Sequence, residues 1–526
     1  MPLRPALSEW TSAPCDLLVV GGGATGLGVA VQAALEGRQV VLVEALDFAS
    51  GTSSRSTKLL HGGVRYLVQG RIKLVREALR ERAIVLGLAP HLAQPLPFVV
   101  HERSVWSWAL TTVGLKLYQW LAGRLSLGPT QTLSADALNH SAHVLPGTLA
   151  AVRYWDGQFE DARLALALAQ TAQAAGARVH NHVRVMGLVR QGEGWQVRLK
   201  DALNGQEAEI HANCVVNATG VWVDGLRQMA MPSNSPQQAL PGLVKPSQGV
   251  HWVVERALLP LKEAVLVPRT SDGRVLFAVP WLGATVIGTT DTPRNDAPLE
   301  PRPMAEELAF LLKETERALG VRLRAEDVKS VWVGLRPLVV GGSDASGGTA
   351  QLSREHLIAR ESAGFVTVTG GKWTTYRSMA QDVLAELVRS GDLTAPLRVA
   401  HTERHTLFGA PPPGTPAVSL RDAPGLHLLG TQAAQVAVAA GSEEILGLGL
   451  TAAMVRYAAR SEWAVTVEDM LARRWRVLFL DARLAARMAP RVAELLQQET
   501  GIDPALPAFL DLCQQYQLRP SDLAGT

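Results

Sequence analysis

The first fifty residues combine nearly continuous apolar runs with one glycine-rich turn. Residues 15–20 (CDLLVV) have almost no polar face, as expected of a parallel strand that is buried on both sides. A glycine-rich segment follows at residues 21–26. Residues 27–35 then show an apolar helical pattern, and residues 39–43 form a second strand candidate. A strand, a glycine turn, a helix and a strand within about 30 residues are typical of a βαβ unit, so the pattern predicts a parallel nucleotide-binding sheet.

Later regions predict a second sheet and a helical end. Residues 164–175 have the pattern of an Ala-rich helix. Three apolar runs, at residues 179–185, 195–199 and 214–216, indicate strands. Between about residues 248 and 290, four closely spaced strand candidates separated by turns predict an antiparallel sheet. Beyond a proline-rich linker the pattern is mostly helical, with helix candidates at residues 433–440, 452–459, 467–478 and 483–497.

These patterns predict an α/β fold with three parts. A Rossmann-like cofactor-binding domain is interleaved with an antiparallel β substrate domain, and a helical domain ends the chain. The expected boundaries are 14–80, 150–235 and 350–398 for the discontinuous cofactor-binding domain, 81–149 and 236–349 for the substrate domain, and 399–526 for the C-terminal helical domain.

Composition and charge narrow the class of protein. Of the 526 residues, 47% are hydrophobic and 19% charged, which is a globular composition and excludes disordered and collagen-like proteins. The 51 Lys and Arg side chains nearly balance 48 Asp and Glu, and no long basic run is present, so we expect no nucleic-acid partner. Cys15, Cys214 and Cys513 lie too far apart for a disulfide framework or a CxxC metal pair, and we expect no metal site. No apolar signal segment begins the chain, which favours a cytoplasmic protein.

One apolar segment is almost as long as a membrane-spanning helix. It comprises residues 105–122 (VWSWALTTVGLKLYQWLA). Lys116 and several polar residues interrupt the segment, so the pattern favours a buried or surface-lying helix over a transmembrane one. Its Trp and Tyr side chains leave interfacial membrane contact as the alternative.

Gly21, Gly23 and Gly26 have the spacing of the dinucleotide-binding fingerprint and stand between the predicted strand and helix. Such glycines allow a tight turn, close approach of the backbone to a pyrophosphate and close helix packing, while the helix N-terminus offers N–H groups to the phosphates. Glu44 ends the next strand, about 20 residues further on, where a carboxylate accepts hydrogen bonds from a ribose diol. These residues leave FAD and NAD open, but the later Ala218-Thr219-Gly220 turn and the N-terminal position of the unit favour FAD.

Four separated motifs carry a closer resemblance. They are residues 50–67 (SGTSSRSTKLLHGGVRYL), 288–292 (GTTDT), 334–338 (GLRPL) and 370–377 (GGKWTTYR). In this order they closely resemble the FAD-dependent glycerol-3-phosphate dehydrogenases, which are aerobic, quinone-linked flavoproteins. The similarity runs from about residue 14 to 395 and continues into the C-terminal domain at residues 455–458 and 468–474.

The chain departs from the family pattern at two positions. Val221 stands where the family often has Pro, and Trp475 stands where a small polar residue is usual. The first departure leaves the cofactor assignment unchanged, whereas the second leaves open what the C-terminal domain contacts.

The resemblance implies oxidation of sn-glycerol 3-phosphate to dihydroxyacetone phosphate, in which the C2 hydroxyl loses a proton and C2 loses a hydride to flavin N5. Arg65 and Lys372 match family positions that bind substrate, and Tyr66 adjoins the first. At the family position of His251 we expect the base. Arg336, a charge within an apolar run, is expected to face the substrate and stabilise a developing oxyanion. The alternatives are structural: solvated cations, a structural ion pair for Arg336 and an ordinary core histidine.

The same resemblance implies the cofactor site. The residues expected to contact FAD are Gly21, Gly23, Gly26, Glu44, Thr52, Ser53, Ser54, His61, Val183, Ala218, Thr219, Gly220, Gly371, Trp373 and Thr374. Asp291 is expected to orient a cation or hydroxyl, unless it serves only a turn or helix cap.

Several functions remain open at this point. The first is the dehydrogenase, which would pass electrons to a quinone and lie peripherally on the inner face of the cytoplasmic membrane. The alternatives are a glycerol-3-phosphate oxidase that uses O2, a related amine or hydroxy-acid flavin oxidase, and a non-catalytic FAD-binding module. The joint presence of Arg65, His251, Arg336 and Lys372 argues against the last.

Two further points stay undecided by the residues. Assembly as a monomer or as a homodimer is open. For residues 473–474, a pair of arginines on an expected helix, a solvated or salt-bridged face is favoured over binding of lipid headgroups.

Overall fold

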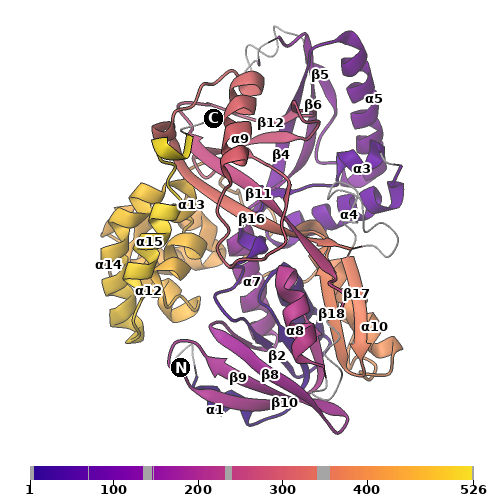
Figure 1. Ribbon diagram of the computed structural model, residues 1–526, viewed down its shortest axis with the longest axis vertical. Helices are drawn as coiled ribbons and strands as arrows, with labels where there is room; N and C mark the ends of the chain where they lie inside the picture. Colours follow the sequence, from indigo (N-terminus) through magenta and orange to yellow (C-terminus); the bar gives the residue numbers. More distant parts are fainter. Residues whose placement is uncertain are drawn as a thin grey trace.

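Two β-sheets and a group of C-terminal helices make up the molecule, and the sheets lie one above the other in Figure 1. The computed structural model describes residues 5–68, 70–133, 145, 147–231, 240–340 and 356–523. Strands from the N-terminal βαβ unit form the lower sheet, and the strands of residues 244–293 belong to the upper one. The chain crosses between the sheets several times, so each sheet is assembled from distant segments.

The lower sheet has eight strands and is parallel at its centre. In path order its strands are β17 (His356–Ser362), β18 (Phe365–Gly370), β10 (Glu207–Asn217), β1 (Cys15–Val20), β2 (Val40–Val43) and β7 (Arg178–His180), with the antiparallel hairpin β8 (Val183–Gln191) and β9 (Gly194–Asp201) attached to β10. Strand β1 pairs in parallel with both β2 and β10 and is almost wholly buried, which explains its lack of a polar face.

One predicted strand of this sheet is two strands. The segment 179–185 divides between β7, which joins the parallel sheet, and β8, which begins the hairpin. His182 between them has a left-handed backbone with φ of 54°. The apolar pattern continues across this turn because both flanking segments are buried, so periodicity could not reveal the break.

Three helices pack together beside this sheet: α2 (Ala24–Leu35), α7 (Asp161–Ala174) and α10 (Tyr376–Arg389). Their contact surfaces are made of small residues. A Cβ at Gly28 of α2 would lie 2.8 Å from the ring of Tyr376, so this glycine permits the close approach of α10.

The upper sheet has ten strands. They are β15 (Thr292–Pro293), β11 (Val244–Glu255), β14 (Ala284–Gly288), β13 (Leu276–Trp281), β12 (Ala264–Val267), β4 (Ala93–Glu102), β6 (Ala150–Phe159) and β3 (Leu59–Leu60) in path order, with β16 (Val328–Val339) beside β11 and β5 (Gln131–Leu133) beside β6. Strand β11 pairs antiparallel with β14 and β16, as the close spacing of strands predicts. The exception is β12, which pairs in parallel with β4.

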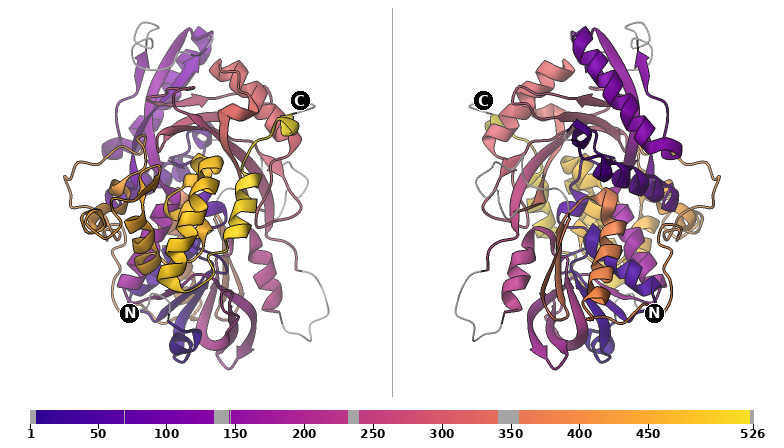
Figure 2. Two further views of the ribbon diagram at one scale, coloured as in Figure 1. Left: turned by 90° about the vertical axis from the view of Figure 1, so that its left-hand side faces the viewer. Right: turned by 90° about the vertical axis from the view of Figure 1, so that its right-hand side faces the viewer.

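The C-terminal helices are part of the main core rather than an appendage. They are η7 (Leu426–Gln432), α11 (Ala433–Ala437), α12 (Ala452–Ser461), the π-helical turn η8 (Asp469–Arg474), α13 (Val477–Leu480), α14 (Ala482–Thr500), α15 (Leu506–Gln515) and η9 (Pro520–Leu523), with the small hairpin β19 (Ile445–Gly447) and β20 (Leu450–Thr451). Leu471, Val477 and Leu496 share one hydrophobic cluster with Leu17 of β1 and Leu168 of α7. The left view of Figure 2 shows these helices against the region where the two sheets meet.

The single helix predicted over residues 467–478 is wrong. The chain forms a π-helical turn, then leaves the helix at Arg476, whose φ is 62°, before α13 begins. The interruption directs the buried side chain of Arg476 toward the N-terminus of α7, where its ion-pair partners Glu160 and Asp161 lie.

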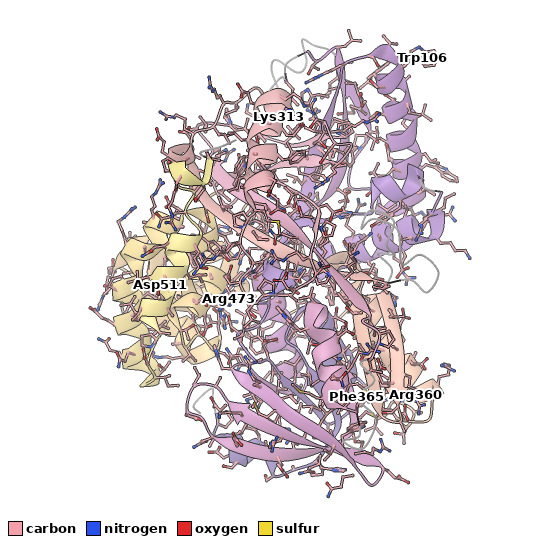
Figure 3. The ribbon with its side chains drawn as sticks, viewed as in Figure 1. Trp106, Lys313, Arg360, Phe365, Arg473 and Asp511 are labelled. Atoms are coloured by element: carbon pink, nitrogen blue, oxygen red, sulfur yellow. The ribbon has the colours of Figure 1, made fainter. Side chains whose placement is uncertain are left out.

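Surface helices and several buried helical turns make up the rest. They are α1 (Leu7–Thr11), η1 (Thr52–Ser54), α3 (Val64–Val68), α4 (Ile72–Leu88), α5 (Val105–Ala122), η2 (Gly123–Leu125), η3 (Gly220–Trp222), α8 (Val223–Met229), α9 (Ala305–Leu319), η4 (Ala325–Asp327) and η6 (Trp373–Thr375). Helix α5 lies on the surface, and Trp106 at its start projects away from the molecule in Figure 3. Among the described residues, no helix combines the length and the hydrophobicity that crossing a bilayer requires.

Candidate functional site

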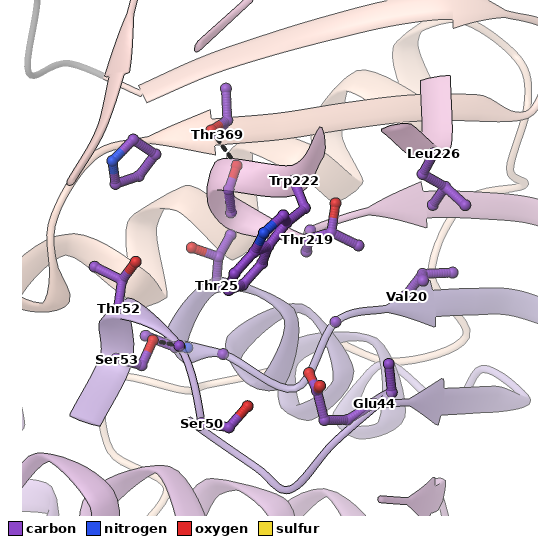
Figure 4. Close-up of a pocket in the computed structure, with 18 of the residues that line it drawn as sticks. Val20, Thr25, Glu44, Ser50, Thr52, Ser53, Thr219, Trp222, Leu226 and Thr369 are labelled. Carbon is purple, nitrogen blue, oxygen red and sulfur yellow. Dashed lines mark hydrogen bonds between the residues drawn. The ribbon is translucent and has the colours of Figure 1, made fainter. Parts of the chain in front are cut away.

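A cavity of about 370 Å³ opens where the parallel strands β1, β2 and β10 end. The predicted residues that line it are Gly21, Gly23, Glu44, Thr52, Ser53, Val183, Ala218, Thr219, Gly220, Gly371, Lys372 and Trp373. Several lining residues were not predicted, among them Thr25, Ser50, Trp222 and Leu226 (Figure 4). Trp222 lies two residues after Gly220 of the Ala218-Thr219-Gly220 turn, so its place in the sequence was a usable signal.

The glycine turn between β1 and α2 has no room for side chains. Gly21 has φ of 111°, and a Cβ at Gly26 would overlap the carbonyl oxygen of Gly21. Gly23 is the N-cap of α2 and supplies no side-chain cap, so the helix N-terminus is open on the side of the cavity. The backbone N–H of Ala24 donates to Oγ of Ser53 at 3.0 Å. A helix N-terminus of this kind attracts a phosphate group.

Glu44 stands at another part of the cavity wall (Figure 4). Its carboxylate accepts hydrogen bonds from the backbone N–H groups of Gly22 at 2.6 Å and Leu46 at 2.9 Å. Burial raises the pKa of Glu44, although both of these hydrogen bonds favour the ionised form. An acceptor beside a side-chain-free turn and a helix N-terminus fits the ribose and pyrophosphate of FAD, so the residues present match this cofactor.

Residues 50–58, which we call the flavin loop, connect the cavity to the upper sheet. Oγ1 of Thr52 donates to the carbonyl of Leu335 at 2.6 Å, and Nε1 of Trp373 donates to the carbonyl of Ser53 at 2.8 Å. At the other end of the loop, Oγ1 of Thr57 lies 2.9 Å from Nε2 of His251. One end of the flavin loop therefore lies at the cofactor cavity, and the other end contacts the predicted base.

Two predicted residues near the loop do not line the cavity. Ser54 is buried, and its carbonyl oxygen faces charged side chains beneath the loop. Thr374 is also buried, and its hydroxyl donates to the carbonyl of His61 at 3.4 Å. His61 itself stays outside the cavity wall, and its contact with the flavin remains a prediction.

Arg336 and His251 lie on adjacent strands of the upper sheet. In the β11–β16 register Ser247 pairs with Arg336, and His251 pairs with Trp332. Nη1 of Arg336 lies 3.2 Å from Asp291, as the expectation for an orienting carboxylate requires. A Cβ at Gly249 would overlap the Arg336 guanidinium, so the missing side chain makes the space for this cation.

The environment of His251 keeps its imidazole neutral. The side chain is buried and stacks on Trp332 with ring centroids 4.1 Å apart. Burial lowers the pKa of His251 well below its ordinary value, and the positive charges of Arg336 and Lys58 lower it further. Among the described residues, Nδ1 of this ring has no hydrogen-bond partner. A neutral imidazole is the form that can accept a proton.

Lys372 and Tyr66 are far apart in the sequence but in contact in the structure. Nζ of Lys372 lies 3.8 Å from the centroid of the Tyr66 ring, beside the His61-Gly62-Gly63 turn. Lys372 also lines the cavity. The side chain of Arg65, the third predicted substrate contact, lies outside the described residues.

The turn that precedes Tyr66 is held by a residue that sequence reasoning missed. The hydroxyl of Tyr118 on α5 accepts from the backbone N–H of Gly62 at 2.9 Å and donates to Asp156 at 2.8 Å. Asp156 in turn forms a buried ion pair with Arg82 at 2.9 Å. Nothing in the apolar pattern of α5 marks Tyr118, because its partners lie on other elements.

A second charged group lies between the lower sheet and the C-terminal helices. Asp47, His182 and Asp469 are close enough together to resemble a metal site. Arg473 lies 2.5 Å from Asp47 and 3.0 Å from Asp469, and Arg474 also pairs with Asp47, so guanidinium groups already compensate these carboxylates. Both arginines are buried, as Figure 3 shows for Arg473 between the yellow helices and the sheets. Of the expected solvated or salt-bridged face, the salt bridges are therefore present, but they are buried rather than solvated.

Comparisons with known proteins agree with this geometry. Residues 16–377 match the family model described as FAD dependent oxidoreductase, and residues 426–506 match the C-terminal domain of alpha-glycerophosphate oxidase. The mitochondrial glycerol-3-phosphate dehydrogenase of Macaca fascicularis is 39% identical, with 93% of this chain and 71% of the relative covered. The mitochondrial enzyme of the same name from Arabidopsis thaliana is also 39% identical, with 94% and 84% covered.

Solved structures show the same likeness. The glycerol-3-phosphate dehydrogenase from Bacillus halodurans, complexed with FAD, has a TM-score of 0.74 at 27% identity, covering 98% of this chain and 97% of that one. The FAD-bound L-alpha-glycerophosphate oxidase from Mycoplasma pneumoniae has a TM-score of 0.56 at 18% identity, covering 71% and 95%, and shows the fold alone. These matches confirm the predicted fold class and FAD as the cofactor.

Glu44→Gln is expected to weaken FAD binding. The amide has one acceptor oxygen and no charge, so we expect a loss of about 10-fold in affinity, or ~1.4 kcal/mol. Titration of the apoprotein with FAD, followed by quenching of flavin fluorescence, measures the change. The control is Glu306→Gln, at an exposed position on α9. Equal affinities for the wild type and Glu44→Gln would contradict the assignment.

Proposed function

Because the chain belongs to the FAD-dependent glycerol-3-phosphate dehydrogenase family, we propose that it oxidises sn-glycerol 3-phosphate to dihydroxyacetone phosphate and passes the electrons to a membrane quinone. One observation carries the proposal for the substrate. A neutral His251 lies against Thr57 of the flavin loop, Arg336 is oriented by Asp291, and Lys372 lines the cavity that the start of the same loop also lines. This set supplies a proton acceptor and two cations, which suits a phosphorylated alcohol.

His251 acts as the base in this reaction. This role requires the tautomer in which Nε2 donates to Oγ1 of Thr57, because Nδ1 then keeps the lone pair that accepts a proton. Nδ1 takes the proton of the C2 hydroxyl as the carbon–hydrogen bond at C2 breaks. FAD, when bound, supplies the two-electron acceptor that receives the hydride at N5.

Arg336 and Lys372 stabilise different charged groups of the substrate. Arg336 is fixed by Asp291 and by the hydroxyl of Thr289 at 3.1 Å, so its guanidinium is preorganised to stabilise the oxyanion that develops at C2. Lys372, on the glycine turn at the cavity, binds the phosphate together with Arg65. Arg65 and Lys372 together with Arg336 are more cations than a single carboxylate needs, which argues against an amine or hydroxy-acid oxidase.

Quinone as the acceptor is supported by the surface of α5. Trp106 is 87% exposed, Leu110 77% and Trp120 69%, and their spacing places them on one face of the helix. Exposed cations of α4, Lys73, Arg76 and Arg80 among them, belong to the neighbouring helix. An apolar aromatic face next to cations suits the headgroup region of an anionic membrane.

Helix α5 is also adjacent to the substrate site. Tyr118, on its inner face, holds the turn at Gly62 that leads to Tyr66. A quinone dissolved in the bilayer would therefore meet the protein close to the flavin. We infer a peripheral position on the inner face of the cytoplasmic membrane. The match of the C-terminal domain to an alpha-glycerophosphate oxidase domain is the observation that supports the alternative acceptor, O2.

Lys372→Ala is expected to raise the KM for glycerol 3-phosphate by about 10-fold or more, because one charged hydrogen bond to the phosphate is lost. Steady-state kinetics with bound FAD quantified by absorbance measures the effect. Lys313→Ala, on the exposed face of α9 (Figure 3), is the matched control and should leave KM unchanged. An unaltered KM in Lys372→Ala would remove this lysine from the phosphate site.

The pH dependence of kcat/KM should reflect the low pKa of His251. Because burial lowers this pKa, the ring stays neutral and kcat/KM stays constant until the pH falls below the ordinary imidazole range of about 6.5. His251→Asn should lower kcat by about 100-fold or more and abolish the acid limb. An acid limb at or above the ordinary imidazole value would contradict the role of His251.

Replacing Trp106 and Trp120 by Ser should detach the protein from vesicles that contain anionic lipid and should lower quinone-analogue reduction. The rate at which glycerol 3-phosphate bleaches the flavin without oxygen should stay the same, because these exposed side chains lie on the outer face of α5 and not on the face that carries the buried Tyr118. Val438→Ser, which changes an apolar side chain that is 85% exposed elsewhere, is the control. Unchanged vesicle binding would refute the membrane surface, and stoichiometric peroxide in air would favour the oxidase.

A further inference from the structure

The flavin loop rests on buried charges that the proposed reaction has not used. Nζ of Lys58 donates to the carbonyl oxygen of Ser54 at 2.8 Å, and Nη2 of Arg476 donates to the same oxygen at 2.7 Å. Lys58 belongs to the loop, whereas Arg476 comes from the C-terminal helices, 422 residues from Ser54 in the chain. Both cationic side chains are 0% exposed. Two charged donors thus fix one carbonyl of the loop.

Two carboxylates balance these cations. Asp161 lies 2.7 Å from Nζ of Lys58, and Glu160 lies 2.9 Å from Nε of Arg476. Both acids stand at the N-terminus of α7, where the helix dipole favours negative charge. We call Lys58, Glu160, Asp161 and Arg476 the buried charge cluster. The four formal charges cancel, and all four side chains are 0% exposed.

The buried charge cluster touches the groups that contact the base. Asp161 also accepts from the hydroxyl of Ser56 at 2.7 Å, and the next residue, Thr57, carries the hydroxyl that lies 2.9 Å from His251. Nζ of Lys58 lies 4.7 Å from the centroid of the Trp332 ring, on whose face His251 stacks. Residues 54–58 therefore contact the buried charge cluster and also, through Thr57, the base.

Stability alone gives little reason for charges at this place. Replacing a buried group of ion pairs by apolar side chains of similar volume is often neutral or stabilising, because desolvation offsets much of the Coulomb attraction. Arg476 already packs on the ring of Phe479 at 3.9 Å, so an apolar side chain would suit its surroundings. What an apolar side chain cannot do is donate to the carbonyl of Ser54.

We propose that Lys58 and Arg476 are positioning residues for substrate oxidation, which hold the Ser54 carbonyl and thereby keep Thr57 in place against His251. The C-terminal helices then complete the active site through Arg476, although none of their residues lines the cavity. The inference rests on the proposed function, because it assigns these residues a role in proton removal by His251.

Lys58 also acts on His251 through its charge. The groups that face Lys58 are Asp161 and Glu160 from α7, Arg476 from the C-terminal helices, and His251 across Trp332. Desolvation lowers the pKa of Lys58 to about 7, against the opposing effect of Asp161. In its charged form Lys58 lowers the pKa of His251. A neutral side chain at position 58 would therefore raise the pKa of the base.

The first experiment compares Arg476→Met, Arg476→Lys and Arg163→Met as FAD-loaded full-length proteins. Arg163 is the matched control: it forms a buried two-bond ion pair with Glu462 of the C-terminal helices, at 2.9 and 2.8 Å, and so donates to Glu462 rather than to the flavin loop. The readouts are Tm, FAD content, KM for glycerol 3-phosphate, and the rate of flavin bleaching per bound FAD without oxygen.

We expect Arg476→Met to slow flavin bleaching by about 10-fold or more with KM within about 3-fold of wild type, because only the placement of the base changes. Arg476→Lys, which can still donate to Ser54, should recover most of this rate. Arg163→Met should have a lower Tm than the wild type but the same rate of flavin bleaching. Equal rates per bound FAD in wild type and Arg476→Met, or equal losses in Arg476→Met and Arg163→Met, would overturn the proposal.

The second experiment uses the pH profile, which a merely structural role would not move. Lys58→Met should shift the acid limb of kcat/KM to higher pH, because removing a cation stabilises the protonated imidazole. An unshifted limb would overturn the electrostatic part of the proposal. The wild type serves as the separate test of function: if glycerol 3-phosphate fails to bleach its flavin, the proposed function fails, whatever the variants do.

A third comparison covers the case in which Arg476→Met does not fold. Thr57→Val keeps the shape of the side chain and removes its hydroxyl, and Lys58→Met removes the other donor to the Ser54 carbonyl. If Lys58 acts through Thr57, the effects of these two changes on the bleaching rate, measured above the acid limb, should be less than additive in the double variant. Strict additivity within about 2-fold would show that the two residues act independently and would overturn the proposal.

Discussion

Charged side chains that are removed from water hold the lower sheet, the flavin loop and the C-terminal helices in fixed relative positions. A buried charge without a partner is strongly unfavourable, so each of these groups requires its counterpart at hydrogen-bond distance. Arg473 needs Asp47, and Arg476 needs Glu160, across a boundary that separates them by hundreds of residues in the chain. Because the contact between Arg473 and Asp47 is a directional hydrogen bond, this boundary is defined more narrowly than hydrophobic contact alone would define it.

The candidate site follows from this arrangement. Strands β11 and β16 place His251 and Arg336 on the upper sheet, whereas the lower sheet provides the glycine turn and Glu44. Neither sheet holds a complete site. The flavin loop spans the distance between them, because its Ser53 contacts α2 and its Thr57 contacts His251. Substrate oxidation therefore depends on the relative position of the two sheets.

The surface helix α5 adds a link between the site and its surroundings. Its outer face is apolar and exposed, while Tyr118 on its inner face reaches the turn beside Tyr66. A single helix thus contacts both the solvent-facing surface and the substrate site. This arrangement is the physical basis for placing the electron acceptor on that side of the molecule.

The sequence by itself determined the local chemistry of this protein. The turn at Gly21, Gly23 and Gly26, the position of Glu44 and the strands of the antiparallel sheet were predictable, because each depends on residues that are near one another in the chain. Family resemblance then placed Lys372 and Trp373 at the cavity that they line.

Only the tertiary structure decided which charges are buried and what they contact. The pattern around residues 467–478 predicted one helix with a solvated or salt-bridged face, whereas the helix breaks at Arg476 and the arginines are buried. Tyr118 and Lys58 likewise gave no signal in their own segments. The reason is physical: periodicity reports which positions face an apolar interior, but the partner of a buried polar group is chosen by distance in space.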